Sequence, residues 1–339
     1  MTCSLTEPAL AKAHKFLLRA QPPALEGEPL QTRQAALWQD FRVFDTPSDE
    51  WVPAYVAAAL AETGESALAT EAARHWWRAL VSRGVAALGY RAGSARDADS
   101  TLWACRLARL LGEQQHPAYA RFVAFLRGCI RPDGGLATFP SARALAAQFA
   151  TQPRIRQGHG WTRSHVCVTA AALWLPEIAA IPDVTRFLVR AQTPEGYWNP
   201  YWWADREYST ALAIESLARL QPDHPDDGAQ QAIAKGAQWL SSFPPGASAF
   251  RLALRVSGLA QARLSAFIPP LNELMELQLD DGSWPASARM RIPPLDSDHP
   301  DRRWNWDEHG TSFASIVLDQ ERIFTTATAV RALTACSKM

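Results

Sequence analysis

Two aspartates stand just before an apolar, helix-periodic run, and their type and spacing are suited to acid chemistry. They are Asp97 and Asp99, followed by Ser100, Thr101 and the apolar run 102–107. A carboxyl group at a helix start can face an apolar cavity that the helix borders. The helix dipole strengthens this acid, while burial and a second carboxylate keep its proton in place at neutral pH. The arrangement suits protonation of a carbon–carbon double bond.

A carbocation made in this way needs stabilisation without a nucleophile, and the chain is rich in rings that supply it. Fourteen tryptophans are more than core packing readily explains, and several cluster between the expected helices. One aromatic face stabilises a nearby cation by roughly 0.5–2 kcal/mol. The candidate substrate- and cation-binding residues are Asp49, Trp103, Trp161, Trp198, Trp202, Trp203, Tyr208, Trp304, Trp306 and Phe324. His165 is a candidate to orient Asp99 or to return its proton.

Each of these candidates also has a structural alternative. An aspartate at a helix start is often an N-cap, which applies to Asp99 and Asp49. His165 can be a core histidine, and the pair His165 and Cys167 diverges on a helix, so no metal site is expected there. The cluster 198–203 can belong to a turn, and Trp304 with its neighbours can form a surface lid.

Six alanine-rich segments recur along the chain and predict helices that are buried on most faces. They begin near Asp49, Asp99, His165, Tyr208, Phe250 and Phe324. A more amphipathic segment precedes each of them, at 6–20, 66–83, 116–128, 182–191, 229–241 and 268–278. Six outer and six inner helices predict an all-α fold, an (α/α)6 barrel or toroid, as a single domain over 1–339. Parallel inner helices place their six starts at one mouth.

Two long intervals interrupt this repeat, at about 131–164 and 280–322. Both are rich in Pro, Gly, Asp and aromatic residues, which favours loops. Long structured loops inside a compact domain usually serve function. The carboxylates Asp296, Asp298 and Asp301 of the second interval are interpreted as solvated loop residues.

Composition and charge exclude several classes of partner. The 34 basic and 34 acidic residues give a formal net charge of +0, so we expect no nucleic acid as a partner. The sequence has no apolar run of about 18 residues, so we expect no transmembrane segment. Five widely spaced cysteines without a CxxC pair argue against a disulfide framework. Together with an N-terminus that lacks a signal peptide, they predict a cytoplasmic protein.

Three segments between the expected helices share a pattern. Two of them, 192–198 and 278–284, have Gln, Gly and Trp at matching positions, and 131–136 is a degraded copy. They resemble the QW motif of the squalene–hopene cyclase and oxidosqualene cyclase superfamily. In that family the Gln caps a helix end and the Trp stacks over it, which ties outer helices together. The same residue types allow this physically, because Gly supplies the turn, Gln the hydrogen bonds and Trp an apolar lid.

The segment 97–101 resembles the D-x-D-D motif of class II terpene cyclases, and the helix that follows is similar too. The resemblance implies that Asp99 is the general acid that protonates an alkene or epoxide, and that Asp97 helps to position it. Ser100 departs from the last aspartate of the squalene-type motif. Family members usually pair this barrel with a second helical domain, whereas this chain has one barrel. The resemblance therefore implies that the barrel encloses its own cavity or that a second subunit of a homodimer closes it.

The sequence therefore predicts a class II-type terpene cyclase that uses an Asp general acid for proton-initiated cyclisation of a prenyl chain. The substrate is a small isoprenoid, either a prenyl diphosphate or a prenylated small molecule. No cofactor is expected, except Mg²⁺ if the substrate carries a diphosphate. Arg91, Arg96, Arg163, Arg206 and Arg322 are the candidate phosphate ligands near the mouth.

Three other functions share the expected barrel. A protein prenyltransferase β-subunit-like domain would bind zinc through a D-x-C pair, which the chain lacks. A carbohydrate-active (α/α)6 enzyme would use Trp platforms and paired carboxylates such as Asp205 and Glu207. The last is a non-catalytic toroid that binds a partner in its concave face. The serine at position 100, in place of the last motif aspartate, is what a protein that had lost catalysis would show.

Overall fold

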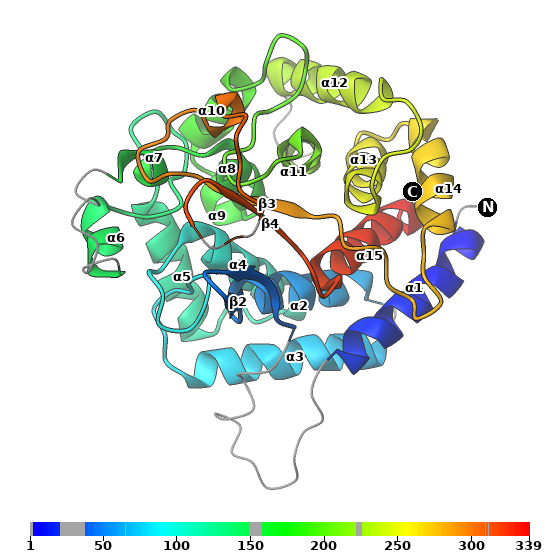
Figure 1. The fold of residues 1–339 in the computed structure, drawn as a ribbon, viewed down its shortest axis with the longest axis horizontal. Helices are drawn as coiled ribbons and strands as arrows, with labels where there is room; N and C mark the ends of the chain where they lie inside the picture. Colours follow the sequence, from blue (N-terminus) through cyan, green and yellow to red (C-terminus); the bar gives the residue numbers. More distant parts are fainter. Residues whose placement is uncertain are drawn as a thin grey trace, which may run out of the picture.

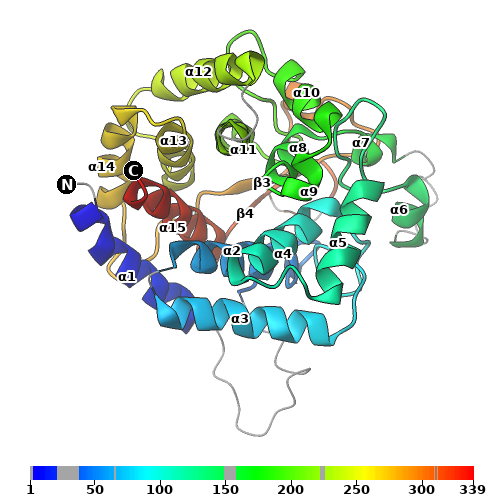
Figure 2. The same cartoon turned by 180° about the vertical axis from the view of Figure 1, so that it is seen from behind.

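Helices of the protein are arranged in two concentric layers around a common axis (Figures 1 and 2). The computed structural model describes residues 3–20, 38–64, 66–148, 158–221, 226–308, 310 and 312–339. The inner helices are α2 (Trp51–Thr63), α4 (Ala98–Leu111), α8 (Val166–Ala172), α11 (Arg206–Leu220), α13 (Ala249–Gln261) and α15 (Ile323–Ser337). Each inner helix packs against the next along the chain, and α15 packs against α2, so that the ring closes.

The outer layer places one amphipathic helix before each inner helix in the chain. These are α1 (Cys3–Arg19), α3 (Ala67–Ser82), α5 (Pro117–Gly128), α10 (Pro182–Arg190), α12 (Asp227–Ser241) and α14 (Ile268–Glu276). Shorter helices lie in the connections: α6 (Ala142–Gln148), α7 (His159–Thr162), α9 (Pro176–Ala179), η3 (Ser265–Phe267) and η4 (Pro300–Arg302). The alternation of alanine-rich and amphipathic segments thus predicted the order and the approximate bounds of both layers correctly.

The inner helices tolerate burial on nearly every side because small residues dominate them. In α2 all residues from Trp51 to Ala61 are buried, and Gly64 ends the helix with a left-handed φ of 65°. The outer helix α3 is amphipathic instead, with Ser66 as its N-cap, and buries its Trp76 face. The inner layer therefore forms the core, and the outer layer covers it.

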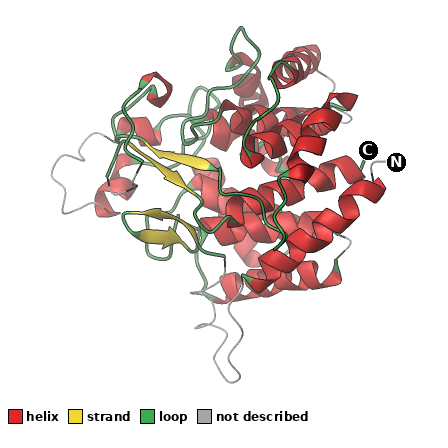
Figure 3. Ribbon diagram, turned by 45° about the vertical axis from the view of Figure 1, so that its right-hand side comes forward, coloured by secondary structure: helices red, strands yellow, loops and turns green. Residues whose placement is uncertain are grey.

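The expectation of a purely α-helical chain is corrected by two small antiparallel sheets on one side of the helical layers (Figure 3). Strands β1 (Asp40–Val43) and β2 (Thr46–Ser48) form one hairpin, and β3 (Arg289–Ile292) pairs with β4 (Ser315–Leu318). β3 and β4 lie in the interval 280–322, which the sequence pattern assigned to loops. The main chain of 202–204 also bonds to β3, through Arg291 N–H to Trp202 O at 2.7 Å and Ala204 N–H to Arg289 O at 3.0 Å. Backbone pairing across the mouth explains these strands without a sequence periodicity.

The two segments with the Gln, Gly and Trp pattern join adjacent outer helices. The Gln192 amide donates to Ala232 O in α12 at 2.8 Å, and the Trp198 indole donates to Leu188 O in α10 at 2.7 Å. In the second copy, Gln278 donates to Ala9 O in α1 at 2.9 Å, while Trp284 donates to Leu274 O in α14. The Trp is therefore a hydrogen-bond donor as well as an apolar lid.

The third segment keeps the glycine of this pattern and replaces the other two residues. A Cβ at Gly134 would collide with the backbone of Asp183 in α10, as one at Gly196 would with the backbone of Lys235 in α12. Both glycines have positive φ, at 93° and 102°. Ile130 stands in the Gln position and Leu136 in the Trp position, and the neighbouring Arg131 donates to Phe139 O at 2.8 Å and to Pro140 O at 2.9 Å. The segment thus packs closely against α10 at Gly134, but its polar bonds go to the loop at 139–140 and not to a neighbouring outer helix.

Inside the ring, away from the sheets, four charged side chains from four inner helices form a closed ionic group. Arg106 pairs with Glu62 and Glu215, and Arg331 pairs with the same two carboxylates at 2.9 and 2.8 Å. The group links α2, α4, α11 and α15. Its net charge is zero, so burial leaves no charge without a counter-ion.

Candidate active site

An aromatic cavity opens at the side of the ring that carries the sheets. It encloses about 860 Å³ of empty space, its open mouth included. Its walls are formed by Val43, Phe44, Trp51, Tyr90, Arg91, Ser94, Ala95, Asp97, Asp99, Ser100, Thr138, Phe139, Trp161, Trp202, Trp203, Met290 and Ile292. The walls are mostly apolar, and they hold one basic and two acidic residues.

Both aspartates of the sequence motif reach this cavity from the start of α4, but they differ in their bonding. Asp97 is the N-cap, and its carboxyl accepts hydrogen bonds from Ser100 N–H at 2.7 Å and from the Ser100 hydroxyl at 2.9 Å. Asp99 lies in the first turn and is half-buried. The indole N–H groups of Trp103 and Trp51 lie near the Asp99 carboxyl, yet neither has a partner at full hydrogen-bond geometry among the described residues. Asp99 is therefore the carboxyl that is free to face a bound molecule.

Burial raises the pKa of both carboxyls. Desolvation raises the pKa of Asp99 to about 7, and the indoles of Trp103 and Trp51 lower it by favouring the carboxylate. Desolvation also raises the pKa of Asp97 to about 8, with further increases from the charges of Asp99 and Glu50 and decreases from the Ser100 bonds. Protons thus remain on this site at neutral pH.

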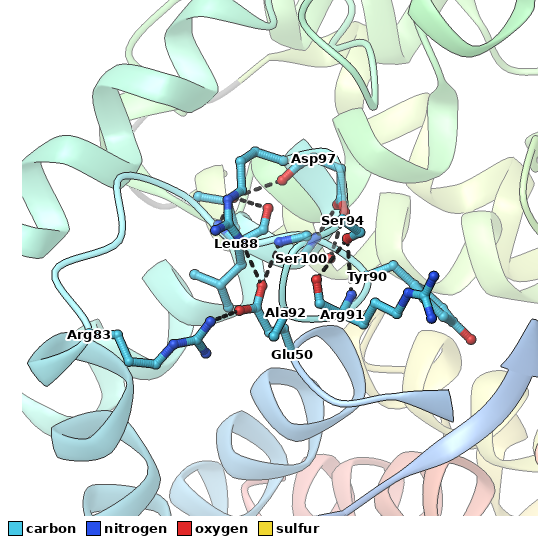
Figure 4. Close-up of polar contacts among 12 residues, drawn as sticks. Glu50, Arg83, Leu88, Tyr90, Arg91, Ala92, Ser94, Asp97 and Ser100 are labelled. Carbon is cyan, nitrogen blue, oxygen red and sulfur yellow. Dashed lines mark hydrogen bonds and ion pairs between the residues drawn. The ribbon is translucent and has the colours of Figure 1, made fainter. Parts of the chain in front are cut away.

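The loop between α3 and α4 carries five cavity residues and is held in place by Glu50 (Figure 4). Glu50 is fully buried and pairs with Arg83 and, at 3.0 Å, with Arg96. It also accepts the Gly89 N–H at 2.8 Å. Because two guanidinium groups and a backbone N–H surround it, this carboxylate is suited to a structural role. Glu50 was not predicted from the sequence, although an acid directly before an alanine-rich segment was a usable signal.

Five of the sequence candidates line the cavity. They are Asp97, Asp99, Trp161, Trp202 and Trp203. Trp161 and Trp202 meet edge to face with ring centroids 4.9 Å apart. The cluster 198–203 and the interval 131–164 therefore both contribute to the wall.

Three further candidates lie one layer behind this wall and are fully buried. Tyr208 stacks on Trp203 with centroids 4.2 Å apart, and Phe324 stacks on the same ring at 5.2 Å. Trp103 packs edge to face on Tyr55 at 4.5 Å. First-turn residues of several inner helices thus gather at one end of the ring, as the repeat predicted. These rings support the cavity wall from behind instead of forming it.

The structure places four other candidates away from the cavity wall and gives each another contact or environment. The Asp49 carboxylate accepts the Ala92 N–H at 2.7 Å, and Trp198 lies in its inter-helix joint. The Trp304 side chain is 89% exposed. Trp306 donates to Arg303 O at 2.9 Å. Main-chain hydrogen bonds account for the positions of Asp49, Trp198 and Trp306, whereas Trp304 is surrounded by solvent.

His165 is not bonded to Asp99, which corrects the expectation that it orients the acid. It is 1% exposed and stands at the N-cap position of α8, where its side chain makes no capping bond. Its Nδ1 lies 2.7 Å from the Thr138 hydroxyl, and its Nε2 lies 2.8 Å from Gly160 O. Both ring nitrogens are thus occupied by other partners. Burial lowers the pKa of His165 to about 3, so the ring is neutral.

Four of the five candidate phosphate ligands are engaged elsewhere. Arg96 pairs with Glu50, Arg163 with Asp298 and Arg322 with Asp281, while the guanidinium of Arg206 lies over the Tyr197 ring, 4.5 Å from its centroid. Arg91 is the basic residue among those that line the cavity. Among the described residues, no group of three or more His, Cys, Asp or Glu side chains could hold a metal ion.

Several wall residues were not selected from the sequence. Phe44, Tyr90, Thr138, Phe139, Met290 and Ile292 line the cavity. Thr138 and Phe139 belong to the interval 131–164, whose length and aromatic content were the available signal. Met290 and Ile292 come from β3, a strand that no periodicity in the sequence predicted.

Comparison with known proteins adds a family to this geometry. No protein-family model matches the chain, and no curated protein matches it. Among solved structures, a variant of the type II terpene cyclase MstE from Scytonema, in complex with its substrate geranylgeranyl dihydroxybenzoate, is 30% identical, with a TM-score of 0.86. The match covers 99% of each chain. A protein from Actinoplanes is 31% identical over 97% of this chain and 99% of its own, with a TM-score of 0.85.

A more distant structure shares the fold alone. The ent-copalyl diphosphate synthase from Streptomyces platensis is 16% identical, with a TM-score of 0.55, over 86% of this chain and 50% of its own. In the described residues, no helix is long and apolar enough to cross a membrane. The sequence identity to MstE, which extends over nearly the full length of both chains, decides which family the chain belongs to. This chain belongs to the type II terpene cyclases.

Proposed function

We propose that Asp99 is the general acid and that it protonates the prenyl chain of a small aromatic molecule to start cyclisation. One observation carries the proposal. Asp99 faces an aromatic cavity with only the indole N–H groups of Trp51 and Trp103 beside its carboxyl, whereas Ser100 holds the Asp97 carboxyl with two hydrogen bonds. The segment 97–100 then acts as a variant of the D-x-D-D motif, in which Ser100 takes over the bond to Asp97 that positions it.

The cavity wall supports the second half of the reaction. A cation formed at the double bond would meet the rings of Trp51, Trp161, Trp202 and Trp203, which line the cavity. Their faces attract a cation, and their apolar surface offers it no nucleophile. Loss of a proton then ends the reaction and leaves a cyclised isomer of the substrate.

The charges of the wall favour a prenylated aromatic substrate over a prenyl diphosphate. A diphosphate carries several negative charges, and Asp97 and Asp99 lie in the same cavity. One lining arginine, Arg91, is available to offset it, because the other candidates are engaged. MstE, whose substrate is geranylgeranyl dihydroxybenzoate, points to the same substrate class.

Two structural assignments accompany this proposal. The closed ring of inner helices, each preceded by an outer helix, supports assignment of the fold to the (α/α)6 barrels. The paired bonds of Gln192 and Trp198, repeated at Gln278 and Trp284, support assignment of these segments to the QW motif.

The proposal is tested by turnover of geranylgeranyl dihydroxybenzoate in D₂O. Protonation of a carbon by the acid places one deuterium on the ring system in a position that does not exchange back. A cyclised product with one such deuterium, detected by mass spectrometry, is the expected result. Cyclised product without carbon-bound deuterium would show that the reaction does not begin with protonation.

The substrate class gives a separate prediction. Geranylgeranyl dihydroxybenzoate is expected to react roughly 100-fold more efficiently than geranylgeranyl diphosphate, a difference of about 3 kcal/mol in transition-state binding. A chelator is expected to leave the first reaction unchanged. Steady-state kinetics with both substrates, with and without EDTA and Mg²⁺, measure this. A faster, Mg²⁺-dependent reaction of the diphosphate would contradict it.

The pKa values predict how turnover depends on pH. The acid must carry its proton, and the pair titrates near 7 and 8. Turnover is therefore expected to be highest below about pH 7 and to fall about tenfold per pH unit above about pH 8. A pH profile of kcat checks this. A rate that stays constant up to about pH 10 would exclude a carboxylic acid of this pKa as the proton donor.

A further inference from the structure

A chain of three hydrogen bonds runs from the cavity wall into the protein. The Trp202 indole donates to the Thr138 hydroxyl oxygen at 2.7 Å. That hydroxyl lies 2.7 Å from His165 Nδ1, and His165 Nε2 lies 2.8 Å from Gly160 O. A carbonyl oxygen accepts only, so Nε2 holds the proton and Nδ1 accepts from Thr138. The direction of every bond in the chain is thereby fixed.

The inner end of this chain is rigid. His165 is 1% exposed, and its ring stacks on Tyr201 with centroids 3.9 Å apart. The Tyr201 hydroxyl in turn donates to Ser297 O at 2.8 Å. A Cβ at position 160 would collide with Ser297 O and the Tyr201 hydroxyl, so glycine is needed for this close approach of the backbone. The imidazole therefore provides a fixed acceptor for the Thr138 hydroxyl.

The outer end of the chain is the Trp202 ring, which forms part of the wall. It stands edge to face against Trp161, at an interplanar angle of 71°, and also against His165, at 84°. The hydrogen bond to Thr138 therefore fixes the orientation in which the Trp202 ring faces the cavity. Loss of the Thr138 hydroxyl would leave the indole N–H without its acceptor and release the ring.

Thr138 also touches the helix start that carries the acid. Its carbonyl oxygen accepts the N–H of Ala98 at 2.7 Å, the residue between the two aspartates. One residue thus links the position of Asp99 to the position of the Trp202 ring. The distance and angle between a proton donor and the aromatic wall decide which conformation of a flexible prenyl chain is protonated.

We propose that Thr138 and His165 are positioning residues that set the Trp202 ring against Asp99 and thereby determine which cyclised product forms. The inference rests on the proposed function and adds a determinant of specificity to it. Neither residue donates a proton to the substrate or takes one from it. Their effect is on the distribution of products, more than on the rate of protonation.

The test removes the hydroxyl and keeps the shape of the side chain, as Thr138→Val. The share of incompletely cyclised products is expected to rise at least fivefold, while turnover falls less than tenfold and each product still carries deuterium from D₂O. Thr138→Ser, which keeps the hydroxyl, is expected to keep the wild-type distribution. An unchanged distribution in Thr138→Val would overturn the proposal.

A double-mutant cycle separates this chain from a general loss of packing. Trp202→Phe removes the indole donor and is expected to alter the distribution in its own right. In that background Thr138→Val should have no further effect, because the bond it breaks is already gone. Full additivity of the two changes would overturn the proposal. If Thr138→Val does not fold, as judged by its melting transition, His165→Gln takes its place in the cycle under the same criterion.

Failure of this inference and failure of the proposed function give different results. A wild-type protein that makes no deuterated cyclic product disproves the function itself. A wild-type protein that makes deuterated product, with a distribution that Thr138→Val leaves unchanged, disproves the positioning role alone.

Discussion

Asp99→Asn is expected to lower turnover of the prenylated substrate by roughly 10²–10⁴-fold, the usual contribution of a general acid. The amide has nearly the shape of the carboxyl group but no proton of comparable acidity to give. Among the described residues, the other carboxyl of the cavity wall is Asp97, which is held by Ser100 and cannot take over without losing those bonds. Product formation by purified variant and wild type, measured by liquid chromatography, decides the point.

The same substitution is expected to stabilise the fold at high pH. Burial raises the pKa of Asp99 from 3.8 to about 7, so the folded state binds more protons than the unfolded state between these values. Stability of the wild type therefore falls as pH rises through this window and stays reduced above it. Asparagine has no such dependence. The gain should be absent near pH 4 and should reach at most ~4 kcal/mol above about pH 7, since each tenfold change in proton affinity corresponds to about 1.4 kcal/mol.

Denaturation of both proteins at several pH values measures this gain. Asp49→Asn is the matched control, because that carboxylate accepts a backbone N–H outside the cavity wall. It should retain turnover. If Asp99→Asn retains wild-type turnover, the assignment of the acid is wrong, whatever its effect on stability.

The helical ring was predictable from the sequence because its periodicity is a local property. Alanine-rich segments can lie only where helices approach closely on most sides, and amphipathic ones only where one face meets solvent. The bounds of α2, α4 and α15 follow from this alone. The hairpin of β1 and β2 and the pair β3 and β4 do not, since their pairing depends on which loops meet above the ring.

The site was predictable only in part. Asp97 and Asp99 were found because they start an inner helix, and the ends of inner helices meet by symmetry. Trp198 and Trp202 could not be told apart in the sequence, although one closes a joint between outer helices and the other lines the cavity. His165 was placed correctly at a helix start and given the wrong partner. Its actual partner, Thr138, lies in an interval without periodicity, so no repeat could bring the two together.

The ionic group inside the ring yields the largest expected change in stability. Glu215 is 5% exposed and accepts hydrogen bonds from Arg106 and, at 3.0 and 2.8 Å, from Arg331. Glu215→Gln leaves two buried guanidinium groups with one carboxylate, Glu62. Breaking a buried ion pair from one side costs roughly 3–5 kcal/mol. Chemical denaturation at neutral pH is expected to show a loss of this size. Glu71→Gln, which removes an exposed partner of Arg78, should cost at most about 1 kcal/mol.

The pH dependence of that loss identifies its cause. Burial raises the pKa of both carboxyls, but the charges of Arg106 and Arg331 outweigh it, so that the pKa of Glu62 falls from 4.5 to about 2 and the pKa of Glu215 is lowered as well. The stabilisation is therefore complete above about pH 4.5 and is lost at lower pH as the wild-type carboxylates take up protons, Glu62 doing so near pH 2. The difference between Glu215→Gln and wild type should shrink over the same window. A difference that persists unchanged near pH 2 would mean that packing, and not charge, holds α11 to its neighbours. Because Arg106 and Arg331 also lie over the Trp103 ring, at 5.2 and 5.0 Å from its centroid, the same charges support the aromatic layer beneath Asp99.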